Sequence, residues 1–244
     1  MMHSILQDIV SKTHALGFLN LVRVNAEGET TSFESMAEDR SVILHAETHS
    51  PVPEFKSVFG MPNLDKLALH LKNPEYKENA RIEVVEQERN GETIPTHIHF
   101  ENSTGDFQND YRFMNRAIIE EKLKTVKFKG ANWNIVFEPA VASIQRMKLQ
   151  SAANSDEPVF SVRTENNDLV FSFGDAASHA GEFVFQHDVD GSLKHTWSWP
   201  VMPVQSILNL DGETSMSISD QGAMQITVDS GLAKYSYILP AQSK

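Results

Sequence analysis

The stretch from residue 194 to residue 241 reads KHTWSWPVMPVQSILNLDGETSMSISDQGAMQITVDSGLAKYSYILPA. A strand with alternating aromatic residues comes first, followed by a short helix, a polar strand, an apolar strand and a last strand that carries two tyrosines. Strands and helices do not alternate here, so the stretch favours antiparallel sheets over a parallel Rossmann sheet. The expected elements are Leu193–Trp199, Pro203–Leu210, Thr214–Ser219, Met224–Val228 and Lys234–Leu239.

The same order of elements occurs in the first half of the chain. Residues 61–69 (MPNLDKLAL) align with residues 202–210 (MPVQSILNL) through a shared Met-Pro and a shared final Leu-x-Leu. Helix candidates at 4–16 and 140–153 open the two halves. We therefore predict an α+β fold of two similar domains, each with two helices packed on antiparallel sheets. The expected bounds are 1–117 for the N-terminal domain, 118–130 for an interdomain connector and 131–244 for the C-terminal domain.

Turn signals predict where strands pair as hairpins. Asn90-Gly91 separates two strand-like segments, and Asn-Gly supports a tight turn between antiparallel neighbours. Asn166-Asn167 and Asp190-Gly191 lie between further pairs of such segments in the second half. The expected hairpins are 81–88 with 93–101, 160–164 with 169–173, and 182–187 with 193–199.

The composition excludes several classes of protein. The chain has 244 residues, 40% of them hydrophobic and 22% charged, so it holds enough apolar material for a packed core. It has no cysteine, which excludes disulfide scaffolds, zinc ribbons, iron–sulfur clusters and cysteine nucleophiles. No apolar run approaches the roughly 20 residues that span a bilayer, and the start MMHSILQDIV has no basic stretch. We expect a soluble, cytoplasmic protein with no membrane partner.

The charge is unevenly distributed along the chain. The net charge is −12, yet residues 116–148 hold seven of the 21 basic residues and only three acidic ones. One interpretation is a solvated linker, which such charge runs usually are. The other is an acidic body with one positive surface, which would attract a polyanion at that place and repel it elsewhere.

Catalytic signatures are absent from the sequence. It contains no G-x-x-x-x-G-K-[ST], G-x-G-x-x-G or G-x-S-x-G motif. His97 and His99 project to one face of a predicted strand ahead of Glu101, and His45 and His49 could do the same elsewhere. Glu101 follows His99 more closely than in the cupin pattern, as known for that family. We interpret these histidines as surface or sheet-face residues, and we expect no enzyme activity, no metal and no cofactor.

The layout resembles that of DNA polymerase sliding clamps, in particular the trimeric clamps of the proliferating cell nuclear antigen type and of T-even-type bacteriophages. The ending AKYSYILPA, from Ala233 to Ala241, is similar to the last strand and tail of the nuclear antigen type. The order of elements covers nearly the whole chain, and the residue-level likeness covers residues 194–239. The length and the lack of a long, recognisable interdomain loop favour a phage-type clamp in a host cytoplasm.

This resemblance implies a ring of three subunits that encircles double-stranded DNA without reading its sequence and tethers DNA polymerase, with a clamp loader as a further partner. Helices line the hole in that family, so basic residues on predicted helices become the candidates for facing DNA. Ordinary exposed helix charges are the alternative interpretation. On the predicted helix 140–153, we expect Val141 and Ile144 to face the core, and the fourth lining helix, 203–210, has no basic residue. The DNA-facing candidates are Lys12, Lys66, Lys72, Arg146 and Lys148.

Two further surfaces follow from the resemblance. Clamps bind a partner peptide in an apolar pocket beside the connector, and subunits join through strand edges, here 110–115 and 180–186. The pocket candidates are Val42, Leu44, Ile118, Ile119, Leu239, Pro240 and Ala241, and the interface candidates are Tyr111, Phe113, Phe183 and Phe185. For Val42 and Leu44, packing in the core explains the apolar side chains as well as a place in the pocket does.

Two other classes of protein compete with a clamp. A ligand-binding β-rich protein of the sandwich or jelly-roll type, without catalytic activity, would explain the strands but not the repeated placement of helices. A cupin-like metal enzyme would require His97 and His99 to bind a metal.

Overall fold

The computed structural model describes residues 2–89, 91–124, 128, 130–175, 177 and 179–242. The chain divides into two compact units. The first holds residues 1–126 together with 230–235, and the second holds residues 127–229 together with 236–244. Ten strand pairs are antiparallel. Among the described residues, no helix is long and apolar enough to cross a membrane.

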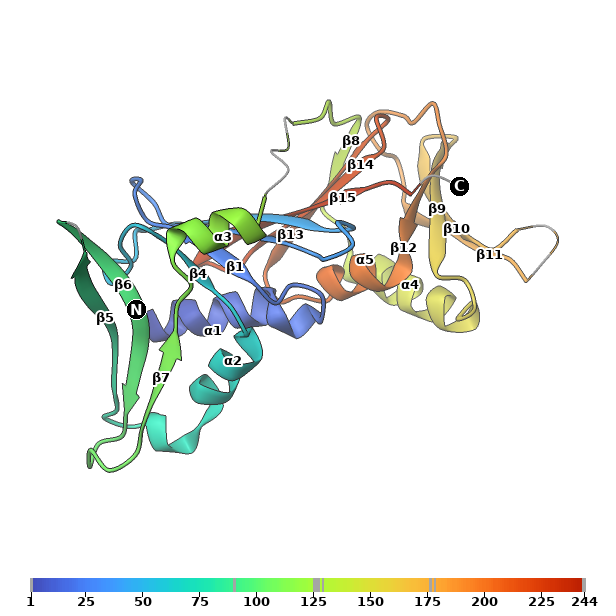
Figure 1. Ribbon diagram of the computed structural model, residues 1–244. Coiled ribbons are helices and arrows are strands. Elements are labelled where there is room, and N and C mark those ends of the chain that lie inside the picture. Colours follow the sequence, from blue (N-terminus) through green and yellow to red (C-terminus); the bar gives the residue numbers. More distant parts are fainter. Residues whose placement is uncertain are drawn as a thin grey trace. The chain divides into compact units, whose positions relative to one another are not determined.

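The first unit contains three helices and two groups of strands (Figure 1). Its helices are α1 (Met2–Lys12), α2 (Leu64–Lys72) and α3 (Arg116–Lys122), and its strands are β1 (Val22–Asn25), β2 (Ser32–Met36), β3 (Ile43–Thr48), β4 (Val58–Met61), β5 (Arg81–Arg89), β6 (Glu92–Glu101) and β7 (Gln108–Arg112). The strand orders are β4-β1-β2-β3 and β5-β6-β7. Helices α1 and α2 pack against each other, while α3 packs on β4. Figure 1 shows α1 and α3 on opposite sides of β1 and β4.

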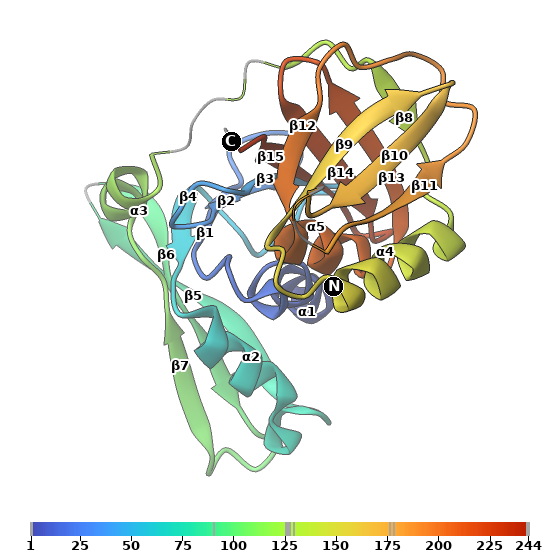
Figure 2. The same cartoon turned by 90° about the vertical axis from the view of Figure 1, so that its right-hand side faces the viewer.

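The second unit repeats this plan with two helices (Figure 2). Its helices are α4 (Val141–Ala153) and α5 (Val201–Leu208), and its strands are β8 (Ile135–Phe137), β9 (Val159–Glu165), β10 (Asp168–Phe173), β11 (Gly181–Gln186), β12 (Trp197–Pro200), β13 (Glu213–Ser219), β14 (Ala223–Asp229) and most of β15 (Ala233–Pro240), whose residues 233–235 belong to the first unit. The strand orders are β15-β14-β13-β8 and β11-β10-β9-β12. Helix α4 packs on β11 and on α5, which in turn packs on β12.

One predicted hairpin is wrong. The segments around Asp190-Gly191 do not pair, because β11 pairs with β10 and β12 pairs with β9 at the opposite edge of the same sheet. Gly191 has a φ of 109°, and a Cβ there would lie 1.9 Å from the Asn134 carbonyl oxygen. The glycine therefore allows close backbone approach within a longer loop, and it does not mark a tight turn.

The connector segment also differs from the expectation. Residues 116–122 form α3 and belong to the first unit, whereas the sequence predicted a connector from residue 118. Asn115 starts this helix by accepting a hydrogen bond from the backbone N–H of Ile118, a common N-cap arrangement. Residues 125–127 and 129 of the predicted connector lie outside the described residues.

Aromatic side chains fill the core of the second unit. Phe171 stacks on Phe185 with ring centroids 4.2 Å apart, and Phe160 lies 4.8 Å from Phe171. Trp199 is fully buried, and its indole N–H donates a hydrogen bond of 3.0 Å to the carbonyl of Leu239. This bond ties β12 to β15, so the aromatic alternation at the end of the chain serves packing.

Candidate DNA-facing helices, connector pocket and open strand edges

Of the two helices α1 and α2, only α2 carries exposed Lys side chains. Its buried stripe is Leu64, Leu67, Ala68 and Leu71, and this leaves Lys66 and Lys72 exposed. His70 stacks on Phe100 at 5.1 Å, and burial followed by the charge of Lys66 lowers the pKa of His70. Both effects favour the neutral form of His70.

The expectation that Lys12 faces outward is wrong. Lys12 is only 4% exposed, and a short 3-10 turn at His14–Leu16 follows α1. On a straight helix, a residue beside the apolar stripe would reach solvent. Here the buried stripe continues past the end of α1 to Leu16 in the 3-10 turn. The exposed face of α1 instead carries Ser4, Gln7 and Ser11.

In the second unit, Arg146 is exposed on α4 and Lys148 is half-buried beside α5. Val141 was expected to face the core, but it is 74% exposed, and Met147 is the only fully buried residue of this helix. The reason is that α4 is held at its carboxyl end, where Gln150 Nε2 donates to the carbonyl of Glu182. Ile144 is half-buried, so the expectation for it holds in part.

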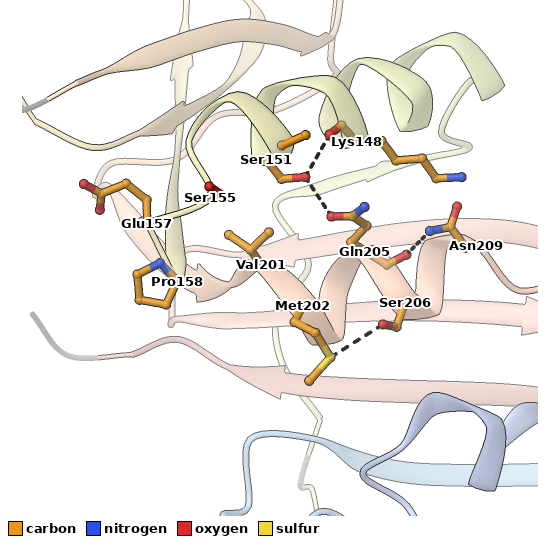
Figure 3. A pocket seen from close by; sticks show the side chains of 11 residues that line it. Lys148, Ser151, Ser155, Glu157, Pro158, Val201, Met202, Gln205, Ser206 and Asn209 are labelled. Atoms are coloured by element: carbon orange, nitrogen blue, oxygen red, sulfur yellow. Dashed lines mark hydrogen bonds between the residues drawn. The ribbon is translucent and has the colours of Figure 1, made fainter.

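A groove of about 530 Å³ lies between α4 and α5 (Figure 3). Its lining is mostly neutral and able to form hydrogen bonds: the Ser151 hydroxyl lies 2.9 Å from Gln205 Oε1, and Asn209 Nδ2 donates to the carbonyl of Gln205. Lys148 is the only cation among the residues that line it. The groove therefore presents polar groups with little net charge, which suits loose contact with a hydrated polyanion.

Helix α3 is fastened to the first unit by an apolar cluster. Ile119 is 0% exposed and packs with Val58 and Leu123. A Cβ on Gly60 would lie 2.9 Å from the Ile119 side chain, so this glycine lets the helix approach β4 closely. Ile118, its neighbour in sequence, is 43% exposed on the outer side of the helix.

Ion pairs reinforce this attachment. Arg116 lies 2.7 Å from Glu27 and 3.1 Å from Glu120 of the next helical turn. Arg23 of β1 lies 3.7 Å from the same Glu120 carboxylate. Apart from Arg23, whose side chain is 19% exposed, these groups are about half exposed, so each pair contributes little alone and the apolar cluster dominates.

A second groove, of about 760 Å³, adjoins the carboxyl end of α3. Phe18, Leu21, Met36 and Leu123 are its apolar walls. The charged residues at the groove are Glu38, Asp39, Arg40 and Lys122. We refer to it as the connector pocket.

None of the predicted pocket residues lines the connector pocket. Val42, Leu44 and Leu239 are fully buried core residues, and Ile119 supports α3 from below. Ile118 is exposed outside the pocket. In the second unit Pro240 is exposed, and Ala241 donates its backbone N–H to the carbonyl of Gly222.

Sequence reasoning missed the residues that do line the connector pocket. Leu123 follows Ile119 by four positions, so the helical spacing was a usable signal for it. Met36 and Phe18 come from segments distant in sequence, and no local pattern marks them.

Strands β7 and β11 lie at the open edges of their sheets. The predicted edge 110–115 is too long, because Met114 exchanges two backbone hydrogen bonds of 2.8 Å with Gly60. The predicted interface residues Tyr111 and Phe185 are buried within their own unit, whereas Phe113 and Phe183 are half-buried. Burial, with a smaller effect from Asp65, raises the pKa of Tyr111, whose hydroxyl donates to the carbonyl of Pro62.

The histidines of β6 lie on the outer face of their sheet, as interpreted from the sequence. His99 Nδ1 lies 2.8 Å from Asp110 Oδ1, and this contact is the main cause that lowers the pKa of Asp110. His97 is partly buried, and that burial lowers its pKa. Within the described parts of the chain, no cluster of three or more His, Asp or Glu residues is placed to hold a metal ion.

No known family model matches the sequence, and no curated protein matches it. Solved structures do. The PCNA of A. fulgidus, in a structure with the C-terminal region of FEN-1 bound to it, matches with a TM-score of 0.69 and 10% identity over 99% of this chain and 96% of that one. The PCNA of Thermococcus kodakaraensis matches with a TM-score of 0.66 and 10% identity over 98% and 97%.

The chain has the sliding-clamp fold. The likeness spans almost the full length of both chains, so it covers both units and not one module alone. This confirms the α+β clamp fold predicted from the order of elements, and it removes the sandwich and jelly-roll alternative. In the clamp fold, α1 and α2 of the first unit correspond in order to α4 and α5 of the second.

Proposed function

We propose that this protein is a sliding clamp: a non-catalytic ring of three copies that encircles duplex DNA and tethers DNA polymerase and other partners. The observation that carries the proposal is the full-length match to two archaeal PCNA structures. The sparse positive charge of the helices and the acidic net charge of −12 support it, because a sliding ring needs weak contact with phosphates inside and repulsion outside. A phage origin and loading by a clamp loader belong to the same proposal.

The connector pocket is our candidate for the partner site. One matching clamp structure holds the C-terminal region of another protein, so a short carboxyl-terminal peptide is the kind of ligand we propose. Apolar walls at Phe18, Leu21 and Met36 would take a few apolar anchors, and the rim carries two acidic and two basic side chains, so the apolar contacts would provide most of the affinity. Exposed Pro240 of the second unit stays a predicted peptide contact that follows from the resemblance alone.

Ring formation predicts a specific cross-linking pattern. The chain has no cysteine, so cysteines introduced at Gln108 of β7 and Gln186 of β11 would be its only thiols. We expect the double variant to form covalent trimers with a bis-maleimide, because a head-to-tail ring brings the two different edges together. Light scattering of the untreated wild-type protein should give three times the chain mass of 27.4 kDa.

The single-cysteine variants are the matched controls. Neither should cross-link, since each edge meets the other edge and not a copy of itself. Cross-linking of one single variant would show a two-fold interface and would contradict the ring, as would a monomer mass for the wild type at all concentrations.

The DNA proposal predicts weak and salt-sensitive binding without sequence preference. Replacing both Lys66 and Lys148 with alanine should weaken duplex binding several-fold and lower the slope of log K against log salt by up to about 2. Titration of a fluorescent duplex at several salt concentrations measures both effects. Lys194→Ala, which removes an exposed cation outside the helices, is the control and should change neither. A preference for one DNA sequence would contradict the proposal.

A further inference from the structure

Two helix flanks carry exposed apolar side chains beside the open strand edges. Leu69 on α2 is 68% exposed and Leu149 on α4 is 71% exposed, although both are large aliphatic residues. Each shares its flank with exposed neighbours three or four positions away, which is the spacing of one helix face. The α2 flank is Asp65, Leu69 and Lys72, and the α4 flank is Ala142, Arg146, Leu149 and Ala153.

The α2 flank lies on the side of β7. Tyr111 of β7 donates its hydroxyl to the carbonyl of Pro62 just before α2, and the charge of Asp65 acts on the same hydroxyl. Farther along, Asn109 of β7 donates to the Tyr76 hydroxyl beyond the carboxyl end of α2. Strand β7 therefore runs antiparallel to α2, at the edge of the unit.

The α4 flank has the matching position beside β11. Gln150, one turn after Arg146, donates to the carbonyl of Glu182 at the start of β11. Phe185 near the end of that strand lies 6.0 Å, between ring centroids, from Phe137, which precedes α4. Strand β11 therefore runs antiparallel to α4, so the two edges have equivalent surroundings.

If β7 of one copy pairs with β11 of the next as the antiparallel strands of this chain do, the neighbouring helices must also meet antiparallel. In the register that brings Asp65 opposite Arg146, Lys72, three residues from Leu69, comes opposite the exposed Glu138 that precedes α4. Charges of opposite sign meet at both ends of the contact. Leu69 falls between them, over Ala142, where its side chain is removed from water.

We propose that the α2 flank of one copy packs on the α4 flank of the next, with an ion pair between Asp65 and Arg146 across the subunit boundary. This inference rests on the proposed ring. It assigns Arg146 to subunit assembly and not to DNA, and it gives Leu69 a partner. Within the described part of the chain, neither Asp65 nor Arg146 forms an ion pair.

A charge-swap experiment on the full chain tests the pair. The variants are Asp65→Arg, Arg146→Asp and the double variant that carries both changes. Each single change places like charges opposite each other, and we expect it to raise the dissociation constant of the trimer about tenfold or more. The double variant restores opposite charges in reversed order and should return to within about threefold of the wild type. Sedimentation over a concentration series measures the constants, and thermal melting checks that every variant folds.

The outcomes separate this inference from the ring itself. Two outcomes would overturn the ion pair and leave the ring standing. In one, neither single change alters the dissociation constant of the trimer. In the other, the double variant is weakened by the sum of the two single effects. Reduced DNA binding by Arg146→Asp at unchanged mass would return Arg146 to the DNA-facing set. A wild-type protein that never forms trimers would overturn the ring and this contact together.

Discussion

Replacing Ile119 with aspartate is expected to release α3 from the first unit. The side chain is fully buried against Val58, Leu123 and the bare backbone of Gly60, where a carboxylate finds no partner. We expect the free energy that holds α3 in place to fall by about 3 kcal/mol or more, which exceeds what the surrounding exposed ion pairs supply. Limited trypsin digestion should then cut rapidly at Lys122 and Lys124, and urea unfolding should report any loss of global stability.

The neighbouring residue provides a matched control. Ile118→Asp makes the same chemical change one position earlier, at a side chain 43% exposed to solvent. Its effect on stability should stay within about 0.5 kcal/mol, and its trypsin digestion should match the wild type. Equal behaviour of the two variants would mean that α3 is not held by the Ile119 cluster.

The same pair of variants bears on the partner site. Leu123 and Lys122 form one side of the connector pocket and are placed by α3. Ile119→Asp should therefore weaken binding of a polymerase tail peptide at least about tenfold, while Ile118→Asp should leave it nearly unchanged. Unchanged peptide affinity in a variant with a released α3 would place the partner site elsewhere.

Replacing Trp199 with alanine is expected to be the most destabilising single change in the second unit. The indole is fully buried and its N–H donates to the carbonyl of Leu239, so truncation opens a large cavity and leaves that carbonyl without its donor. We expect a loss of about 3–5 kcal/mol in the free energy of unfolding, measured by urea titration with far-ultraviolet circular dichroism.

Trp199→Phe separates the two contributions. It keeps most of the buried ring and removes only the N–H donor, so its cost should be nearer 1–2 kcal/mol, a figure about that of one hydrogen bond plus a small cavity. A phenylalanine variant as unstable as the alanine variant would make the bond to Leu239 the main contribution. An alanine variant that loses less than about 1 kcal/mol would contradict the packing of β12 on β15.

The order of elements was accessible from the sequence because local patterns determine it. Helical spacing in 64–72, alternation in 160–173 and turn signals at Asn166-Asn167 each act within about one element. The likeness of residues 61–69 and 202–210 corresponds to two strand-then-helix units, β4 with α2 and β12 with α5. Where the local signal was ambiguous, as at Asp190-Gly191, the predicted partner strand was wrong.

The site residues were less accessible, because exposure depends on what packs over a residue. Lys12 and Arg146 occupy similar places beside apolar stripes, yet Lys12 is buried and Arg146 is exposed. Ile118 and Ile119 are identical in local sequence terms, and only the position of α3 over Gly60 separates a buried support from an exposed neighbour.

By itself, the sequence determined an α+β chain of two similar halves with antiparallel strands, an acidic body and no cysteine chemistry, since composition and short-range periodicity encode these properties. Only the tertiary structure decided which cations reach solvent and which residues line the connector pocket. Those properties arise from contacts between segments far apart in the chain, such as Met36 with Leu123, and no local pattern carries them.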